Sequence, residues 1–401
     1  MGDTGELQAF PFPVADPRHP AAEYAERRAR CPFGMVRLQS GHDARLLASY
    51  RDAVAAASDP RLSQDLTAPG SARPVAGPSF YDDPTSLLNM EGEPHRRIRR
   101  IVAPAFTPKA IAKWQPIVDR VATELLDEMA QLPRPVDLMA AYFFPLPVRV
   151  ICTVLGVPDK DAERFRAWSN AFMSAAEMSI ERQFALIGEF FAYATELVAA
   201  KREDPGADLI DELIAARDGD DRLTESELLS LIVGLIAAGN ETTSNSLGRY
   251  VVTLLGEDRT VWDRLVADPE LIPAAVDELL RLTPVGMSIL LKVATEDVAL
   301  PSGVVAAGEA VLVPTAPAMR DESVFPNADQ VVLDREKRPN LAFGGGAHLC
   351  LGINLALVEL RTALRMLTSR FPGLRIAVPV ETLPYSNGDI LNSLLSLPVD
   401  W

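Results

Sequence analysis

One stretch near the C-terminal end of the chain combines a single cysteine with several glycines. It runs from Phe343 to Gly352 and reads Phe-Gly-Gly-Gly-Ala-His-Leu-Cys-Leu-Gly, with the cysteine at position 350. The glycines let the backbone adopt conformations closed to other residues and approach a bulky ligand. A helix predicted from about Ile353 places Cys350 just before a helix N-terminus, where free N–H groups favour a thiolate. No second cysteine is nearby to build a zinc or iron–sulfur site, but a single thiolate can serve as the axial ligand of a haem iron; an inert cysteine beside a turn is the alternative.

A second motif carries an acid and two hydroxyls within an apolar helix. After the apolar run 228–239 come Asn240, Glu241, Thr242 and Thr243. These side chains are a poor choice for the interior of a buried helix unless something uses them. The alternative, a solvated helix face, is disfavoured because the preceding turns are apolar on nearly all sides.

Two further pairs are spaced to share one face of a helix. His95 and Arg99 are four residues apart, and Glu278 and Arg281 are three apart. The first pair is suited to charge-assisted contacts with carboxylates. The side chains of the second pair can form an ion pair, a pattern that any surface helix may also carry.

Helical periodicity dominates the elements that position these motifs. Thr224 and Glu227 form a capping-box pattern, and the helix they begin is expected to continue to about Leu255, roughly 45 Å at 1.5 Å per residue. Asp268-Pro269 predicts the start of a helix that ends near Pro284. Another helix is expected with its apolar face on Ile117, Val121, Leu125 and Met129. Strands are expected over Ile289–Val293 and Ala310–Val313, with a turn at 301–303 between them. A long loop is expected over Pro60–Pro84. The fold class is therefore mainly α with a smaller β portion.

The composition limits the class of protein. The 401 residues include 39 Lys+Arg and 55 Asp+Glu, a net charge of -16, and 48% are hydrophobic. This apolar content excludes a disordered chain, and the acidity argues against nucleic acid or an anionic membrane as main partner. Three cysteines and the lack of a signal-like start predict the cytoplasm. The longest apolar run is shorter than the roughly 20 residues of a membrane span. No linker is evident, so we expect one domain over 1–401.

The four motifs together resemble those of the cytochrome P-450 superfamily. The stretch 343–352 matches the haem-binding pattern Phe-Gly-x-Gly-x-His-x-Cys-x-Gly at every fixed position. Residues 93–100, 238–243 and 278–281 resemble the family's His-x-x-x-Arg, small-Gly-x-acid-Thr and Glu-x-x-Arg motifs, in the family's order. The resemblance extends from about residue 90 to the C-terminus. It implies a soluble bacterial member with a long central helix over haem b.

The resemblance also implies roles for individual residues. Cys350 is the iron ligand within a loop that includes Phe343, Gly344 and Gly352. Ala238 and Gly239 leave room for O2, Thr242 hydrogen-bonds the oxygen, and Glu241 relays protons. The haem propionates are expected to contact His95, Arg99, His348 and Lys292, the last at a position where many relatives have arginine. Glu278 and Arg281 support the haem loop; Gln330 stands near the place of a further arginine, which leaves Arg335 and Arg338 as candidates to complete that network.

By the same resemblance we expect a haem-thiolate monooxygenase. It inserts one oxygen atom from O2 into a mid-sized, largely apolar substrate, such as a natural-product biosynthetic intermediate. Electrons come from a ferredoxin and its reductase, ultimately from NAD(P)H, and the chain acts as a monomer. Oxidative C–C or C–N coupling or desaturation on the same scaffold is the alternative, and a non-catalytic haem sensor or carrier is the alternative of another class.

Two surface and pocket sets complete the expectations. A basic patch that receives an acidic ferredoxin comprises Arg96, Arg97, Arg100, Lys109 and Lys113. A mainly apolar substrate pocket with a few polar anchors comprises Asn89, Asn240, Val285, Met287, Ser288, Ile289, Ile390 and Leu391; ordinary core is the alternative for each of them.

Overall fold

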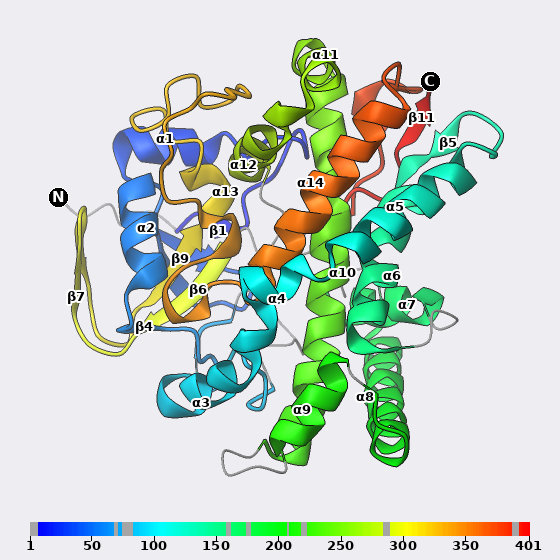
Figure 1. Ribbon diagram of the computed structural model, residues 1–401. Coiled ribbons are helices and arrows are strands. Elements are labelled where there is room, and N and C mark those ends of the chain that lie inside the picture. The colour runs from blue at the N-terminus through cyan, green and yellow to red at the C-terminus, as the bar shows by residue number, and fades with distance from the viewer. Residues whose placement is uncertain are drawn as a thin grey trace. The chain divides into compact units, whose positions relative to one another are not determined.

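The computed structural model describes residues 7–67, 71–73, 83–157, 162–173, 178–206, 208–217, 223–283, 289–386 and 393–401 (Figure 1). The chain contacts divide it into two compact units. The first unit comprises Met1–Pro84, Leu88–Glu91 and Leu280–Cys350, and the second comprises Thr85–Leu87, Gly92–Leu279 and Leu351–Trp401. The expectation of one domain over 1–401 stays a prediction, and the two units are described separately.

The first unit is built on a six-stranded sheet with the order β1-β2-β3-β9-β6-β4. Its central pair, β6 and β9, is antiparallel, whereas β3 lies parallel to β9. All five residues of β9 are buried, as expected of a continuous apolar strand inside a sheet. The strands are β1 (Ala9–Phe10), β2 (Met35–Leu38), β3 (Asp43–Leu46), β4 (Leu62–Ser63), β6 (Ile289–Ala294) and β9 (Ala310–Pro314), and a separate hairpin pairs β7 (Val298–Leu300) with β8 (Gly303–Val305).

The helices of the first unit cover this sheet with small side chains. Helix α2 (Tyr50–Ser58) is capped by Ser49, whose hydroxyl accepts from the Asp52 N–H, and its alanines pack with β6 and β9 in one buried core. The remaining elements are α1 (Glu23–Arg30), α13 (Thr315–Ala318) and two 3₁₀ turns, η7 (Leu341–Phe343) and η8 (Gly346–His348). The two predicted strands over 289–293 and 310–313 are confirmed as β6 and β9. The predicted loop 60–84 includes β4, and residues 68–70 and 74–82 lie outside the described residues.

The second unit is helical apart from a small sheet in the order β10-β11-β5. Helix α12 has its last residues in the first unit. The elements are α3 (Gly92–Val102), η2 (Ala103–Phe106), α4 (Pro108–Ala112), α5 (Gln115–Met129), β5 (Val136–Asp137), η3 (Met139–Phe143), α6 (Pro145–Leu155), α7 (Ala162–Met173), α8 (Ile180–Glu203), α9 (Leu209–Arg217), α10 (Glu225–Leu255), α11 (Thr260–Ala267), η6 (Pro269–Leu271), α12 (Ile272–Leu282), α14 (Ile353–Arg370), β10 (Arg375–Ile376), η9 (Val380–Thr382) and β11 (Pro398–Asp400).

Helix α10 runs through the second unit and contacts α6, α7, α8 and α14 (Figure 1). Both hydrogen bonds of the predicted capping box are present at Thr224 and Glu227, and the helix ends at Leu255 as expected. The helix predicted to begin after Asp268 opens with a 3₁₀ turn, η6, before α12. Among the residues that the structure describes, no helix is long and apolar enough to cross a membrane.

Candidate functional site

The cysteine loop of the first unit is held in shape by its own backbone. The N–H of Cys350 donates to the carbonyl of Phe343 at 2.9 Å. Gly346 has φ +62°, and a Cβ there would lie 3.0 Å from the Cα of Ser58, so only glycine fits at this turn against α2. Cys350 itself is exposed, and α14 begins three residues later. The loop therefore presents a thiol that the protein does not cover, just before a helix N-terminus.

The loop offers one soft metal ligand, the sulfur of Cys350. Within the described ranges, no group of three or more His, Cys, Asp or Glu side chains could hold a metal ion. A lone thiolate on a glycine-built turn suits a metal whose other ligands come from a macrocycle. The donor chemistry at Cys350 therefore fits a haem iron and does not fit a zinc or iron–sulfur site.

His348, in the same loop, contacts a carboxylate that the sequence did not single out. Its Nε2 lies 3.3 Å from Oε1 of Glu91, and that oxygen also accepts the N–H of Gln64 at 2.7 Å. Burial by itself would raise the pKa of Glu91, but the hydrogen bonds from His348 and Gln64 outweigh it and hold the pKa below its usual value. The only signal in the sequence was the position of Glu91 directly before the His-x-x-x-Arg segment.

Lys292 is buried on β6 and joins two segments of the first unit. Its Nζ donates to the carbonyl of Ala57 at 3.1 Å and to that of Leu62 at 3.3 Å. Burial lowers the pKa of Lys292 to about 8, although Glu91 and Asp59 act in the opposite direction. Two of its three N–H donors are thus used inside the protein, and a propionate contact for Lys292 stays a prediction.

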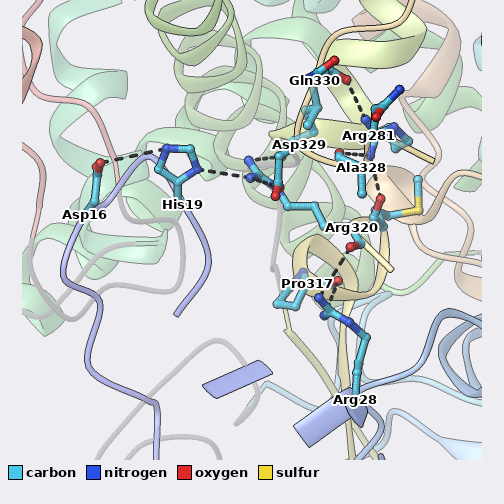
Figure 2. A network of polar contacts seen from close by, with 12 residues as sticks. Asp16, His19, Arg28, Arg281, Pro317, Arg320, Ala328, Asp329 and Gln330 are labelled. Atoms are coloured by element: carbon cyan, nitrogen blue, oxygen red, sulfur yellow. Dashed lines mark hydrogen bonds and ion pairs between the residues drawn. The ribbon is translucent and has the colours of Figure 1, made fainter. Parts of the chain in front are cut away.

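Arg281 donates hydrogen bonds to backbone carbonyls in the segment that precedes the cysteine loop. Its guanidinium donates to Met319 and Ala328, both at 2.8 Å, and to Gln330 at 3.2 Å (Figure 2). The sequence placed Gln330 near the position of a further arginine, and in the structure the backbone carbonyl of Gln330 accepts from Arg281. Glu278 is buried on α12, in the second unit.

Arg320 belongs to the same network and was missed by sequence reasoning. It donates to the Leu282 carbonyl at 3.0 and 3.2 Å, to Asp329 at 2.7 Å, and lies 3.2 Å from Nδ1 of His19 (Figure 2). Leu282 is the last residue of α12, so Arg320 supplies donors to a carbonyl that no helical N–H reaches.

The two candidate arginines from the sequence differ in their contacts. Arg335 donates to Pro326, at 2.6 Å, and shares the Gln330 carbonyl with Arg281. Arg338 instead pairs with Glu336 on the surface. Of these two candidates, Arg335 is the one that joins the Arg281 network.

Helix α10 of the second unit is mostly buried through its middle. From Leu231 to Gly248, Ala238 is exposed and Gly234, Leu235, Gly239 and Thr242 are half-buried, whereas the other residues are buried. Of these, Leu235, Ala238, Gly239 and Thr242 follow the spacing of one helix face. We refer to these four residues as the open stripe. A Cβ on Gly239 would meet only Ile151, at 3.9 Å, so packing within the protein does not require glycine there.

Thr242 and Glu241 lie side by side on α10 in different surroundings. The hydroxyl of Thr242, on the open stripe, donates to the Ala238 carbonyl at 2.8 Å. Glu241 is buried beside the stripe, and its Oε1 accepts from Ser393 at 3.1 Å. No motif in the sequence marked Ser393. Asn240 is buried, away from the open stripe by the helical period, and its Oδ1 lies 3.4 Å from Ser244 Oγ.

His95 and Arg99 share one side of α3. His95 is buried and Arg99 is half-buried, while Arg96 and Arg100 are exposed. Arg96 pairs with Glu93, and Arg97 pairs with Glu227, the capping-box residue of α10. Arg97 is therefore an internal link of the second unit rather than a free cation of the expected basic patch. Lys109 and Lys113 are exposed, as expected.

Most residues expected to line the substrate pocket lie in the parts of the chain that the structure does not describe. Val285, Met287, Ser288, Ile390 and Leu391 lie outside the described residues, as does the side chain of Ile289. Asn89, also expected there, is buried and its amide donates to the Asp83 carbonyl at 2.8 Å.

A model of the family described as cytochrome P-450 matches residues 139–374. The chain belongs to the cytochrome P-450 family. It is 38% identical to the mycinamicin IV hydroxylase/epoxidase of Micromonospora griseorubida, over 99% of this chain and 100% of that protein. It is 41% identical to the nocardicin C N-oxygenase of Nocardia uniformis subsp. tsuyamanensis, over 99% of each.

Solved structures agree with this assignment. A crystal structure of HinD with NMFT and NO is similar, with a TM-score of 0.92, 37% identity and coverage of 99% of this chain and 100% of that chain. The putative thioether synthase SgvP of griseoviridin tailoring has a TM-score of 0.93 at 35% identity, with the same coverage. The expected P-450 fold is confirmed, and the chain is an enzyme of the P-450 monooxygenase type that uses haem-thiolate iron and O2.

Proposed function

We propose that this P-450 inserts one oxygen atom from O2 into a mid-sized, largely apolar natural-product intermediate. The other oxygen atom leaves as water, and two electrons and two protons are consumed. The open stripe of α10 carries the proposal, because the middle of this helix, from Leu231 to Gly248, leaves only small or apolar groups and one hydroxyl not buried. The names of two relatives support the substrate class, since they are described as acting on mycinamicin IV and nocardicin C.

Residues of several motifs would hold the cofactor. Cys350 would provide the thiolate ligand, and Phe343, Gly344 and Gly352 shape the loop around it. His95, Arg99 and His348 would bind the haem carboxylates, because buried carboxylates need charge-assisted partners. Lys292 keeps a donor for the same purpose. Bound haem supplies redox chemistry that amino-acid side chains cannot perform.

Proton delivery would depend on two neighbouring residues of α10. Thr242 uses its hydroxyl proton on the Ala238 carbonyl, so its oxygen is left to accept a hydrogen bond on the open stripe. Glu241, buried next to it, would take protons from solvent and pass them on. Gly239 and Ala238 keep this part of the stripe clear of side chains, which leaves room for O2.

Electrons would come from a ferredoxin and its reductase, and ultimately from NAD(P)H. The exposed cations Arg96, Arg100, Lys109 and Lys113 of α3 and α4 form a locally positive surface on an acidic protein. Such a surface speeds the approach of an acidic partner. We also propose that the enzyme acts as a monomer in the cytoplasm.

A second reaction on the same scaffold has specific support. One structural relative is described as a putative thioether synthase, which favours bond-forming oxidation on this scaffold, so oxidative C–C or C–N coupling or desaturation is the alternative. A non-catalytic haem sensor or carrier is disfavoured, because a carrier has no need of an acid and a hydroxyl beside an open stripe.

The test begins with protein expressed with ample iron and haem precursor. We expect a reduced carbon monoxide complex with the Soret position typical of a thiolate ligand, and Cys350→Ala should lose it. Candidate compounds are then screened for the spectral shift that follows displacement of water from the iron. A positive compound is supplied with ferredoxin, reductase, NADPH and ¹⁸O2. One ¹⁸O atom in the product supports insertion, whereas a coupled or desaturated product without ¹⁸O supports the alternative.

A further inference from the structure

Buried hydrogen bonds join the C-terminal segment of the second unit to Glu241. Oγ of Ser393 lies 3.1 Å from Oε1 of Glu241, and Nδ2 of Asn245 lies 3.1 Å from the same Oγ. Asn245 stands one turn after Glu241 on α10. All three residues are more than nine-tenths buried. Bulk water therefore cannot replace a hydrogen bond that is lost here, and each of these hydrogen bonds restricts the conformations of the side chains that it joins.

The direction of these bonds follows from the donors available. Oδ1 of Asn245 accepts the N–H of Leu394 at 2.8 Å, which turns the NH₂ group of the amide toward Ser393. The amide nitrogen can only donate, so Oγ of Ser393 accepts from Asn245. The single hydroxyl proton of Ser393 is then left for Oε1 of Glu241. Ser393 is thus a fixed donor to this carboxylate.

We propose that Ser393 is a positioning residue for Glu241, holding its carboxylate in the conformation from which it relays protons toward Thr242. The inference rests on the proposed role of Glu241. A glutamate side chain has several rotatable bonds, and a donor fixed by its own partners restricts them. The competing explanation is a brace that only ties the C-terminal segment to α10.

Ser386 provides a matched control for that competing explanation. Its Oγ accepts the N–H of Ser393 at 2.7 Å, and its own N–H donates to the Ser393 carbonyl at 2.8 Å. Ser386 is buried to a similar extent as Ser393, and its hydrogen bonds within the described residues join it to Ser393 rather than to Glu241. Ser386→Ala therefore removes a bond from the same segment without removing the donor to the carboxylate.

The experiment uses the haem-loaded enzyme with NADPH, a plant-type ferredoxin and its reductase, and no organic substrate. Consumption of O2 is followed in H2O and in D2O; each O2 takes up two electrons and two protons to give peroxide, or four of each to give water. A positioned proton-transfer group contributes about 10²–10⁴-fold, and removing one support should cost part of this. We expect Ser393→Ala to slow O2 consumption about tenfold and to raise the solvent isotope effect. Ser393→Thr, which keeps the hydroxyl, should restore both, and Ser386→Ala should match the wild type.

The outcomes separate the inference from the function beneath it. If Ser393→Ala and Ser386→Ala have the same rate and isotope effect, the hydroxyl is only a brace and the inference is overturned. If Glu241→Gln leaves the rate unchanged, the proposed role of Glu241 fails as well. A slow Glu241→Gln beside a Ser393→Ala of wild-type rate overturns the inference alone. The carbon monoxide spectrum and melting temperature of each variant verify that it is folded and holds haem.

Discussion

Replacing Arg320 with alanine should destabilise the protein strongly, although no sequence motif marks this residue. Arg320 is 7% exposed and donates twice to the carbonyl of Leu282, at the end of α12. Its other contacts, Asp329 and His19, are largely exposed and regain water when the arginine is removed. The loss is therefore concentrated at the Leu282 carbonyl and in the space that the side chain filled.

The magnitude follows from these contacts. Charged donors to a buried carbonyl contribute about 1.5–3 kcal/mol, and the partly exposed pair with Asp329 adds at most about 1 kcal/mol. We expect Arg320→Ala to lower the free energy of unfolding by about 3 kcal/mol. Arg320→Lys keeps the charge but loses the forked geometry, so its loss should be intermediate.

Urea unfolding followed by far-ultraviolet circular dichroism measures this difference. Arg335→Ala is the matched control, because Arg335 also donates to backbone carbonyls but is only half-buried, whereas Arg320 is buried. Water can replace its bonds, and its loss should stay below about 1 kcal/mol. Equal losses for the Arg320 and Arg335 variants would refute the reasoning that burial of the Leu282 carbonyl sets the magnitude.

Four further substitutions test the remaining geometry. Burial lowers the pKa of Lys292 from its usual 10.5 to about 8, so between these pH values the unfolded chain binds more protons than the folded chain does. The free energy of unfolding of the wild type should therefore rise with pH over this range. Lys292→Met should abolish that rise in urea titrations across these pH values; a rise that persists in the variant would assign it to another group. Glu227→Gln keeps the capping box but removes the ion pair with Arg97, so it should lower the free energy of unfolding by about 1 kcal/mol. It should leave the rate of reduction by ferredoxin unchanged, whereas Arg96→Ala should slow that reduction. Gly239→Ala should keep or raise the melting temperature, because alanine favours a helix by up to about 1 kcal/mol and its Cβ meets only Ile151. The same variant should nevertheless consume O2 more slowly. Unchanged O2 consumption would argue against the open stripe as the oxygen site.

The sequence predicted the elements that depend on local pattern. The capping box at Thr224 and the length of α10 were both predicted correctly, because caps and apolar periodicity act within a few residues. The strands β6 and β9 were located to within a residue for the same reason. The P-450 motifs identified the family, since spacing along the chain is enough to match them.

Contacts between residues far apart in the chain could not be predicted from the sequence. Nothing local indicated that Arg97 pairs with Glu227, 130 residues away, or that Lys292 donates to Ala57 and Leu62. Arg320, Glu91 and Ser393 likewise gain their importance from partners brought together by packing.

Residue types and spacing by themselves determined which groups the proposed chemistry can use: one cysteine on a glycine-rich loop, an acid with a hydroxyl beside it, and a histidine and an arginine spaced to share one helix face. Only the tertiary structure decided which side chains face a ligand and which are used up inside the protein. The physical reason is that burial and hydrogen-bond satisfaction depend on neighbours far apart in sequence. The open stripe of α10 is the clearest case, because the helical pattern shows which residues share a face, but only packing shows which face is left uncovered.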